Sequence, residues 1–145
     1  IVLNGLEIRK ALCLLRICNR PLLECLLSPI IYKQQLSIVE KIRALMPEYY
    51  SPLRCMHHYL HMAEGNFREY LKKDEVWVKK YFYVLRPVLA CKWIEAGHGV
   101  VPTEFYTLVE RTVDSPQLKN TIDELIERKR NGQELDMGPK IPIIS

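Results

Sequence analysis

Residues 75–96 constrain the fold more than any other part of the chain, because they have the pattern of one long amphipathic helix. The apolar positions recur at spacings of three, four and six, as expected for one helix face. Pro87 interrupts this pattern, and an interior proline costs about 3 kcal/mol unless a bend accommodates it. We therefore predict a long helix with a kink at Pro87. The apolar face comprises Val76, Phe82, Leu85, Leu89 and Trp93.

Start and stop signals predict further helices along the chain. Ser51-Pro52 and Ser115-Pro116 each combine a capping serine with proline at the first helical position. Thr103 is predicted to cap another helix, and Pro47 to end one. The predicted helices cover residues 7–18, 37–45, 52–71 with a bend near Gly65, 75–96, a segment after Thr103, and 116–129.

Few segments have any other pattern. We predict a short apolar turn over residues 22–27, a short strand over 30–32 and an irregular tail over 133–145. The predicted fold class is therefore mainly α, a multi-helix domain with at most one or two short strands. A chain of 145 residues, 48% of them hydrophobic, can bury one sizeable core. We expect a single domain over residues 1–145, and the charged segment 72–74 would be the boundary of a division.

Charge and cysteine content narrow the functional classes. With a formal net charge of +4 and a pI near 8.8, we expect any anion binding to be local, in a pocket and not on a surface that wraps a duplex. The five cysteines include no Cys-x-x-Cys and are expected to be reduced core residues of a cytoplasmic protein. Every long apolar run is broken by Arg, Lys or Pro, so we expect no membrane span. A start at Ile1 instead of methionine indicates a piece of a larger protein.

A basic stripe runs beside the apolar face of the long predicted helix. Lys79, Tyr83 and Arg86 follow one another at helical spacing. Two cations and a phenol on one stripe suit a ligand that carries phosphate, because arginine offers a planar fork and lysine a compact charge. The alternative is an ordinary solvated basic face.

Other catalytic patterns are weak or missing. His57 and His61 would share a helix face as zinc pairs do, but no glutamate stands between them as in His-Glu-x-x-His, and we interpret them as surface or half-buried histidines. The sequence contains neither a glycine-rich phosphate loop nor a Gly-x-Ser-x-Gly elbow. Its adjacent carboxylates, such as Asp74-Glu75, do not resemble a pair that binds catalytic metal.

Several motifs together resemble the predicted nucleotidyltransferases of the DNA-polymerase-β superfamily that are associated with RNA repair. The resemblance covers nearly the whole chain. Members of this family begin with a Gly-Ser loop and an Asp-x-Asp strand that bind metal and triphosphate, so this chain looks like the helical, C-terminal portion. The matching positions are residues 5–12, 19–24, 28–32, 79–93 and 101–105, His58-Tyr59, Met62-Ala63, Lys129, Gly132 and Glu134.

The resemblance implies a function for the basic stripe. The family transfers a nucleotidyl group from a nucleoside triphosphate to an acceptor such as an RNA end, so nucleoside triphosphate and RNA are the implied partners. Any Mg²⁺ would be bound by residues outside this chain, and no residue of the chain is assigned a catalytic role. The alternative is a non-catalytic helical module that binds RNA, nucleotide or a protein. The implied substrate-binding residues are Lys79, Lys80 and Arg86 for phosphates, Tyr83 or Tyr59 for base stacking, and His58 beside Tyr59.

Overall fold

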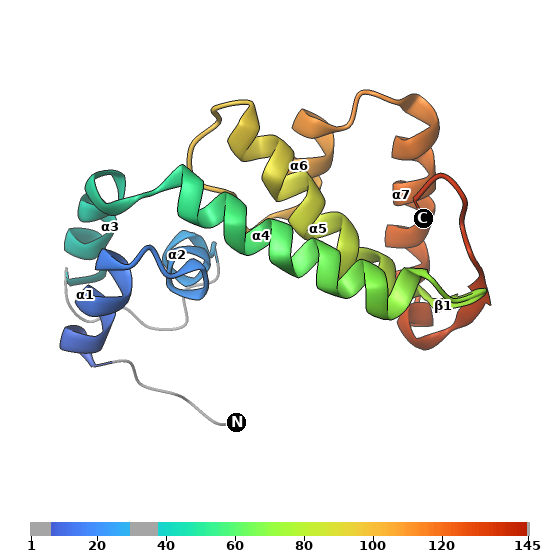
Figure 1. Ribbon diagram of the computed structural model, residues 1–145, viewed down its shortest axis with the longest axis horizontal. Coiled ribbons are helices and arrows are strands. Elements are labelled where there is room, and N and C mark those ends of the chain that lie inside the picture. Colours follow the sequence, from blue (N-terminus) through green and yellow to red (C-terminus); the bar gives the residue numbers. More distant parts are fainter. Residues whose placement is uncertain (1–6, 30–37, 145) are drawn as a thin grey trace. The chain divides into compact units, whose positions relative to one another are not determined.

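The computed structural model describes residues 7–29 and 38–144 and divides the chain into two compact units, residues 1–55 and 56–145 (Figure 1). The described residues form seven α-helices and one two-stranded sheet, which confirms the predicted mainly α class. The boundary between the units falls inside helix α4 (Pro52–Asn66) and not at residues 72–74. The single domain over residues 1–145 stays a prediction. No described helix is both long and apolar enough to cross a membrane.

Three short helices and the first turn of α4 build the first unit: α1 (Ile8–Arg16), α2 (Arg20–Leu27) and α3 (Ile38–Tyr49). The apolar turn predicted over residues 22–27 is wrong, because this segment belongs to α2. The Oδ1 of Asn19 accepts a hydrogen bond from Leu22 N at 3.1 Å, and Pro21 lies in the first turn, where proline is tolerated. The strand predicted over residues 30–32 lies outside the described residues. The core of the unit comprises Ala11, Leu15, Cys18, Leu22, Leu23, Leu26, Ile42, Met46 and Cys55.

Helix α3 corrects a second prediction, because it continues through Pro47 to Tyr49. Pro47 removes one backbone donor and crowds the carbonyl four residues earlier, but it lies only two residues before the end of the helix, so the last turn alone is affected. The next turn still closes, with Tyr50 N donating to Met46 O at 2.9 Å. The cysteines also differ in part from the prediction of core residues, because Cys13 and Cys25 are exposed.

Two of the predicted helix starts are confirmed. Ser51 Oγ accepts from Arg54 N at the start of α4, and Ser115 Oγ accepts from Leu118 N at the start of α7. Thr103 is not a cap, because Glu104 occupies that position without a side-chain hydrogen bond to the helix. The elements after α4 are a π-helical turn η1 (Phe67–Leu71), β1 (Glu75–Trp77), α5 (Val78–Glu95), α6 (Phe105–Thr112), α7 (Pro116–Arg130), a 3₁₀ turn η2 (Gln133–Leu135) and β2 (Met137–Pro139).

A small antiparallel sheet shortens the long predicted helix. Residues 75–77 are a strand, not the first turn of a helix, and they pair with β2 in the tail that was predicted to be irregular. Val76 lies opposite Gly138, and Lys140 N donates to Asp74 O at 2.9 Å. The partner lies about 60 residues away in sequence, so no local pattern could indicate this pairing.

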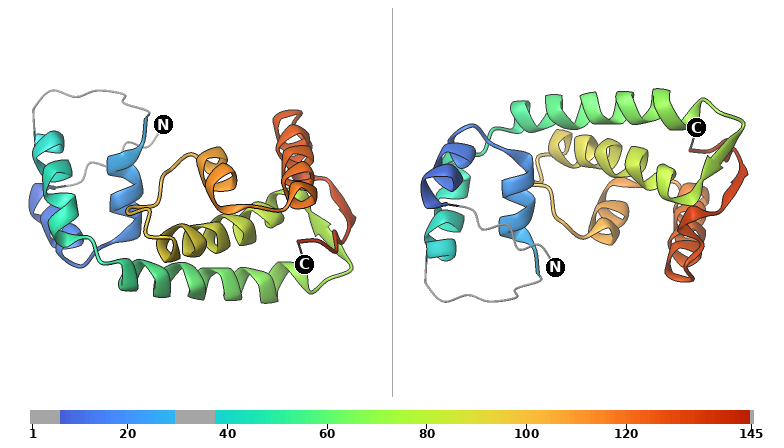
Figure 2. Two further views of the ribbon diagram at one scale, coloured as in Figure 1. Left: turned by 90° about the horizontal axis from the view of Figure 1, so that it is seen from above. Right: turned by 90° about the horizontal axis from the view of Figure 1, so that it is seen from below.

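Helix α5 is the centre of the second unit, and α4 runs beside it in the opposite direction (Figures 1 and 2). Asn66, at the end of α4, donates its side-chain amide to Tyr83 O in the first half of α5 at 2.8 Å. Helix α6 packs against α5 through an edge-to-face contact between Phe105 and Phe82, whose ring centroids are 5.4 Å apart. The buried residues of α5 are Val78, Tyr81, Val84, Leu85, Pro87, Leu89, Ala90, Trp93 and Ile94.

Candidate functional site

A cation between two tyrosine rings lies at the start of α5. The Nζ of Lys80 is 3.6 Å from the ring centroid of Tyr70 and 4.8 Å from that of Tyr83. The two rings meet edge to face with their centroids 6.1 Å apart. Lys80 and Tyr83 come from the same helix face at a spacing of three, and Tyr70 comes from η1. We call these three side chains the Tyr70–Lys80–Tyr83 cluster, a pattern that stabilises a positive charge against aromatic faces.

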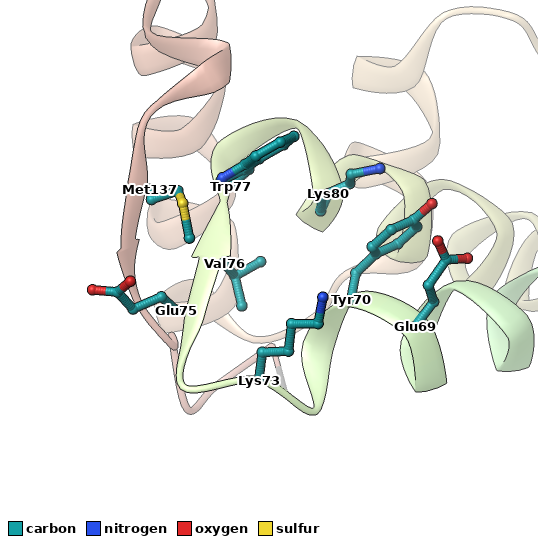
Figure 3. A pocket seen from close by; sticks show the side chains of 8 residues that line it. All are labelled: Glu69, Tyr70, Lys73, Glu75, Val76, Trp77, Lys80 and Met137. Atoms are coloured by element: carbon teal, nitrogen blue, oxygen red, sulfur yellow. The ribbon is translucent and has the colours of Figure 1, made fainter.

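The first cavity borders this cluster on the side of the sheet and has a volume of about 250 Å³. Figure 3 shows Trp77 and Tyr70 on two sides of the cavity and Val76 between them. The Nζ of Lys79 lies 4.9 Å from the Trp77 ring centroid, so a second cation approaches an aromatic face here. The cavity is lined by Glu69, Tyr70, Lys73, Glu75, Val76, Trp77, Lys80 and Met137.

A second cavity, of about 330 Å³, lies further along α5. Tyr83 lines this cavity, whereas Lys80 lines the first, so the Tyr70–Lys80–Tyr83 cluster stands between them. Its walls are mostly apolar, with one amide and one guanidinium group. It is lined by Met62, Asn66, Phe82, Tyr83, Arg86 and Pro87.

Arg86 has a structural role that the sequence did not indicate. Its Nη1 donates to Thr103 O at 3.0 Å and its Nη2 donates to Pro102 O at 3.1 Å. These two bonds hold the segment that leads into α6 against α5. Carbonyl groups with no helix or sheet partner are satisfied in this way.

The structure brings together four of the six predicted substrate-binding residues. Lys79, Lys80, Tyr83 and Arg86 follow α5 in the predicted order and line the two cavities or contact their walls. His58 and Tyr59 lie on α4 and line neither cavity. Of the two tyrosines considered for base stacking, Tyr83 is 47% exposed and Tyr59 only 1%. A ligand can therefore reach part of the Tyr83 side chain, whereas Tyr59 is enclosed by the core.

The aromatic wall of the first cavity is formed by residues that were not predicted to bind a ligand. Tyr70, Lys73 and Trp77 were assigned to a helix end, a charged link and a helix start. Their alternation of aromatic and basic residues beside the basic stripe is the signal that could have identified them. The strand pairing of residues 75–77, which turns Trp77 toward the cavity, is not visible in the local sequence.

Metal binding has little support in the described residues. His57 and His61 are exposed on α4, and no three His, Cys, Asp or Glu side chains gather in residues 7–29 and 38–144 to hold an ion. The first cavity contains two carboxylates, but the amino groups of Lys73 and Lys80 line it as well. These ammonium groups oppose a divalent cation, so the cavity does not fit Mg²⁺.

The residues that carry this site lie within a known sequence family. The family described as the RlaP, RNA repair pathway DNA polymerase beta family matches residues 1–145. The chain belongs to this family. The chain is also 44% identical over 142 residues to the uncharacterized protein YcgL of Bacillus subtilis (strain 168). This matched region covers 98% of the chain and 55% of YcgL. The chain thus spans about half the length of the curated relative. No solved structure shows significant similarity to this chain.

Proposed function

We propose that this chain is the helical nucleotide- and RNA-binding portion of a metal-dependent nucleotidyltransferase that transfers a nucleotidyl group from a nucleoside triphosphate to an acceptor such as an RNA end. The metal and the catalytic carboxylates would be supplied by residues outside these 145 positions. Membership of the RNA repair pathway DNA polymerase beta family supports the reaction class.

The Tyr70–Lys80–Tyr83 cluster is the observation that carries the proposal. An exposed tyrosine next to a lysine ammonium offers a stacking face for a base and a charge for the adjoining phosphate. Lys79 and Lys73 add further cations on the side of the first cavity. Trp77, which is exposed, provides a second ring for a neighbouring base. Arg86 completes the set at the second cavity, where it also anchors the segment before α6.

Binding of a fluorescent single-stranded RNA and of ATP tests this proposal. We expect Tyr83→Ala to weaken RNA binding by about 1–3 kcal/mol, because a stacked base is lost, and Tyr83→Phe to retain most of the affinity. Lys80→Ala should weaken binding of both ligands, and the salt dependence of RNA binding should become shallower. Lys41→Ala removes an exposed lysine from α3 and is the matched control for net charge.

Two outcomes would contradict the proposed binding site or the proposed function. Affinities equal to wild type in Lys80→Ala and Tyr83→Ala, with unchanged melting temperatures, would remove the cluster from the binding site. An absence of both RNA and nucleotide binding in the wild-type chain would favour the alternative, a helical module that contacts a protein partner. Melting curves of every variant separate a loss of affinity from a loss of folding.

A further inference from the structure

Two cysteines of the first unit lie next to each other although they are far apart in sequence. The Sγ atoms of Cys18 and Cys55 are 3.4 Å apart. Both residues are buried, with 6% and 3% of their surface exposed. Cys18 ends the turn after α1, and Cys55 lies in the first turn of α4. Within the described residues, Cys18 is the one residue other than glycine with a positive φ, at 56°.

Hydrogen bonds with Ser51 position the sulfur atom of Cys18 and the backbone of Cys55. Ser51 N donates to Cys18 Sγ at 3.2 Å, and Cys55 N donates to Ser51 O at 3.1 Å. Cys18 N in turn donates to Leu15 O at 2.9 Å, which closes the end of α1. The pKa of the nearby Tyr50 phenol is raised, first by burial and then by the proximity of Cys55 and Cys18. The sulfur atoms thus belong to one packed cluster.

We propose that Cys18 and Cys55 form a reversible intrachain disulfide. A disulfide has an S–S length of about 2.05 Å, so the sulfur atoms need to approach by roughly 1.4 Å from their present 3.4 Å. The other three cysteines are free thiols with different surroundings: Cys13 and Cys25 are exposed, and Cys91 contacts the Met56 carbonyl at 4.0 Å.

Hydrogen peroxide is the two-electron oxidant that we propose for disulfide formation. It oxidises the Cys18 thiol to a sulfenic acid and is reduced to water. The Cys55 sulfur then attacks the Cys18 sulfur, the S–S bond forms, the S–O bond breaks, and the leaving hydroxide takes the thiol proton to give a second water. Two thiols lose two electrons and two protons in total. A dithiol reductant reverses the change by thiol–disulfide exchange.

Burial of the two thiols slows their oxidation, and the disulfide that forms cross-links the chain. Burial and the hydrogen bond with Cys18 raise the pKa of the Cys55 thiol, so this group is protonated at neutral pH and reacts slowly. The disulfide therefore forms more slowly than oxidation of the exposed Cys13 or Cys25. Once formed, it closes a loop that contains α2 and α3, and such a cross-link restricts the unfolded chain.

A variant with only the two paired cysteines provides the sharpest test. The triple variant Cys13→Ser, Cys25→Ser, Cys91→Ser is incubated with hydrogen peroxide, quenched in acid, alkylated under denaturing conditions and analysed by mass spectrometry. We expect both thiols to be lost together, with a mass lower by two hydrogens and a cross-linked peptide that joins the segments of Cys18 and Cys55. Dithiothreitol should restore both thiols. The melting temperature should rise by several degrees on oxidation and return on reduction.

The wild-type chain provides the comparison. In this chain Cys13 and Cys25 are first blocked with a reversible reagent, the protein is oxidised under the same mild conditions, and the two blocked thiols are then released. The number of free thiols should fall from five to three. Adding Cys55→Ser to the triple variant should abolish both the cross-linked peptide and the rise in melting temperature. Two thiols that remain free after prolonged oxidation, or a disulfide that joins Cys18 to a second molecule instead of Cys55, would overturn the proposal.

Discussion

Single side chains decide how α6 reaches α5, and Arg86 is the clearest case. Its guanidinium group donates to the carbonyl oxygens of both Pro102 and Thr103. An arginine that serves only a ligand would not be bound to its own backbone in this way. Because Arg86 also lines the second cavity, one residue links the stability of the α6 segment to the walls of the candidate site.

We predict that Arg86→Ala lowers the free energy of unfolding by about 1–3 kcal/mol, because two carbonyl groups lose a charged hydrogen-bond donor. Arg86→Lys should recover only part of this loss, since an ammonium group lacks the planar fork that reaches two acceptors. Urea denaturation measures both effects. Arg9→Ala, which changes an exposed arginine of α1, is the control, and equal stability of Arg86→Ala and wild type would contradict a structural role.

At the scale of helices, α4 supplies a hydrogen bond that α5 lacks. Pro87 has no N–H, so the carbonyl of Tyr83, four residues earlier, loses its usual partner within the helix. Asn66 at the end of α4 donates its side-chain amide to this carbonyl at 2.8 Å. The proline, which is buried in the core, is therefore accommodated by a neighbouring helix.

We predict that Asn66→Ala lowers the free energy of unfolding by about 1 kcal/mol, the typical effect of losing one hydrogen bond. In the Pro87→Ala background the same change should cost less, because the alanine introduced there can supply a backbone N–H to the Tyr83 carbonyl. The four proteins form a double-mutant cycle in urea denaturation. A coupling energy of zero would show that Asn66 does not compensate for the proline.

At the scale of the whole molecule, each compact unit contains a buried acid that resists ionisation. Burial raises the pKa of Cys55 in the first unit above its ordinary value of 9.0. Burial also raises the pKa of Tyr81 in the second unit above 10.0, although the hydroxyl oxygen accepts a hydrogen bond from Ile141 N at 3.0 Å. Both groups are neutral in the folded protein at pH values where the unfolded chain has begun to ionise.

We therefore predict that the protein becomes less stable as pH rises above about 9. In that range the unfolded state has lost protons that the folded state keeps, so it binds fewer protons and the free energy of unfolding falls with pH. Below pH 9 both states are protonated at these groups and the contribution is fully present. Urea denaturation between pH 8 and pH 11 measures this dependence. The free energy of unfolding should decline less steeply with pH in Cys55→Ser and in Tyr81→Phe than in the wild type. Slopes identical to wild type would show that other groups control the decline.

The positions of most helices could be predicted from the sequence because helix signals are local. The serine–proline starts of α4 and α7 and the end of α7 before Gly132 depend on residues within one turn of each other. Leu22 to Leu27 was predicted as a turn for a related reason: Asn19 before it can end one helix, but its side chain caps the helix that follows. Capping and breaking residues look alike until the next helix is known.

The candidate site could be predicted only along one helix. The spacing of Lys79, Tyr83 and Arg86 on α5 indicated a common stripe, whereas Lys80 on the same helix was predicted only from the family resemblance. Tyr70 and Trp77 come to that stripe from η1 and β1, and the position of β1 depends on pairing with Met137 to Pro139.

The sequence by itself thus determined which segments become helices and which cations share a helix face, because both depend on neighbours a few residues away. Only the tertiary structure decided that a lysine lies between two tyrosine rings, that Asn66 satisfies the Tyr83 carbonyl, and that Cys18 meets Cys55. Apart from the contact between Lys80 and Tyr83 within α5, these contacts join residues 10 to 37 positions apart. Their partners are chosen by how helices pack and not by any repeat along the chain.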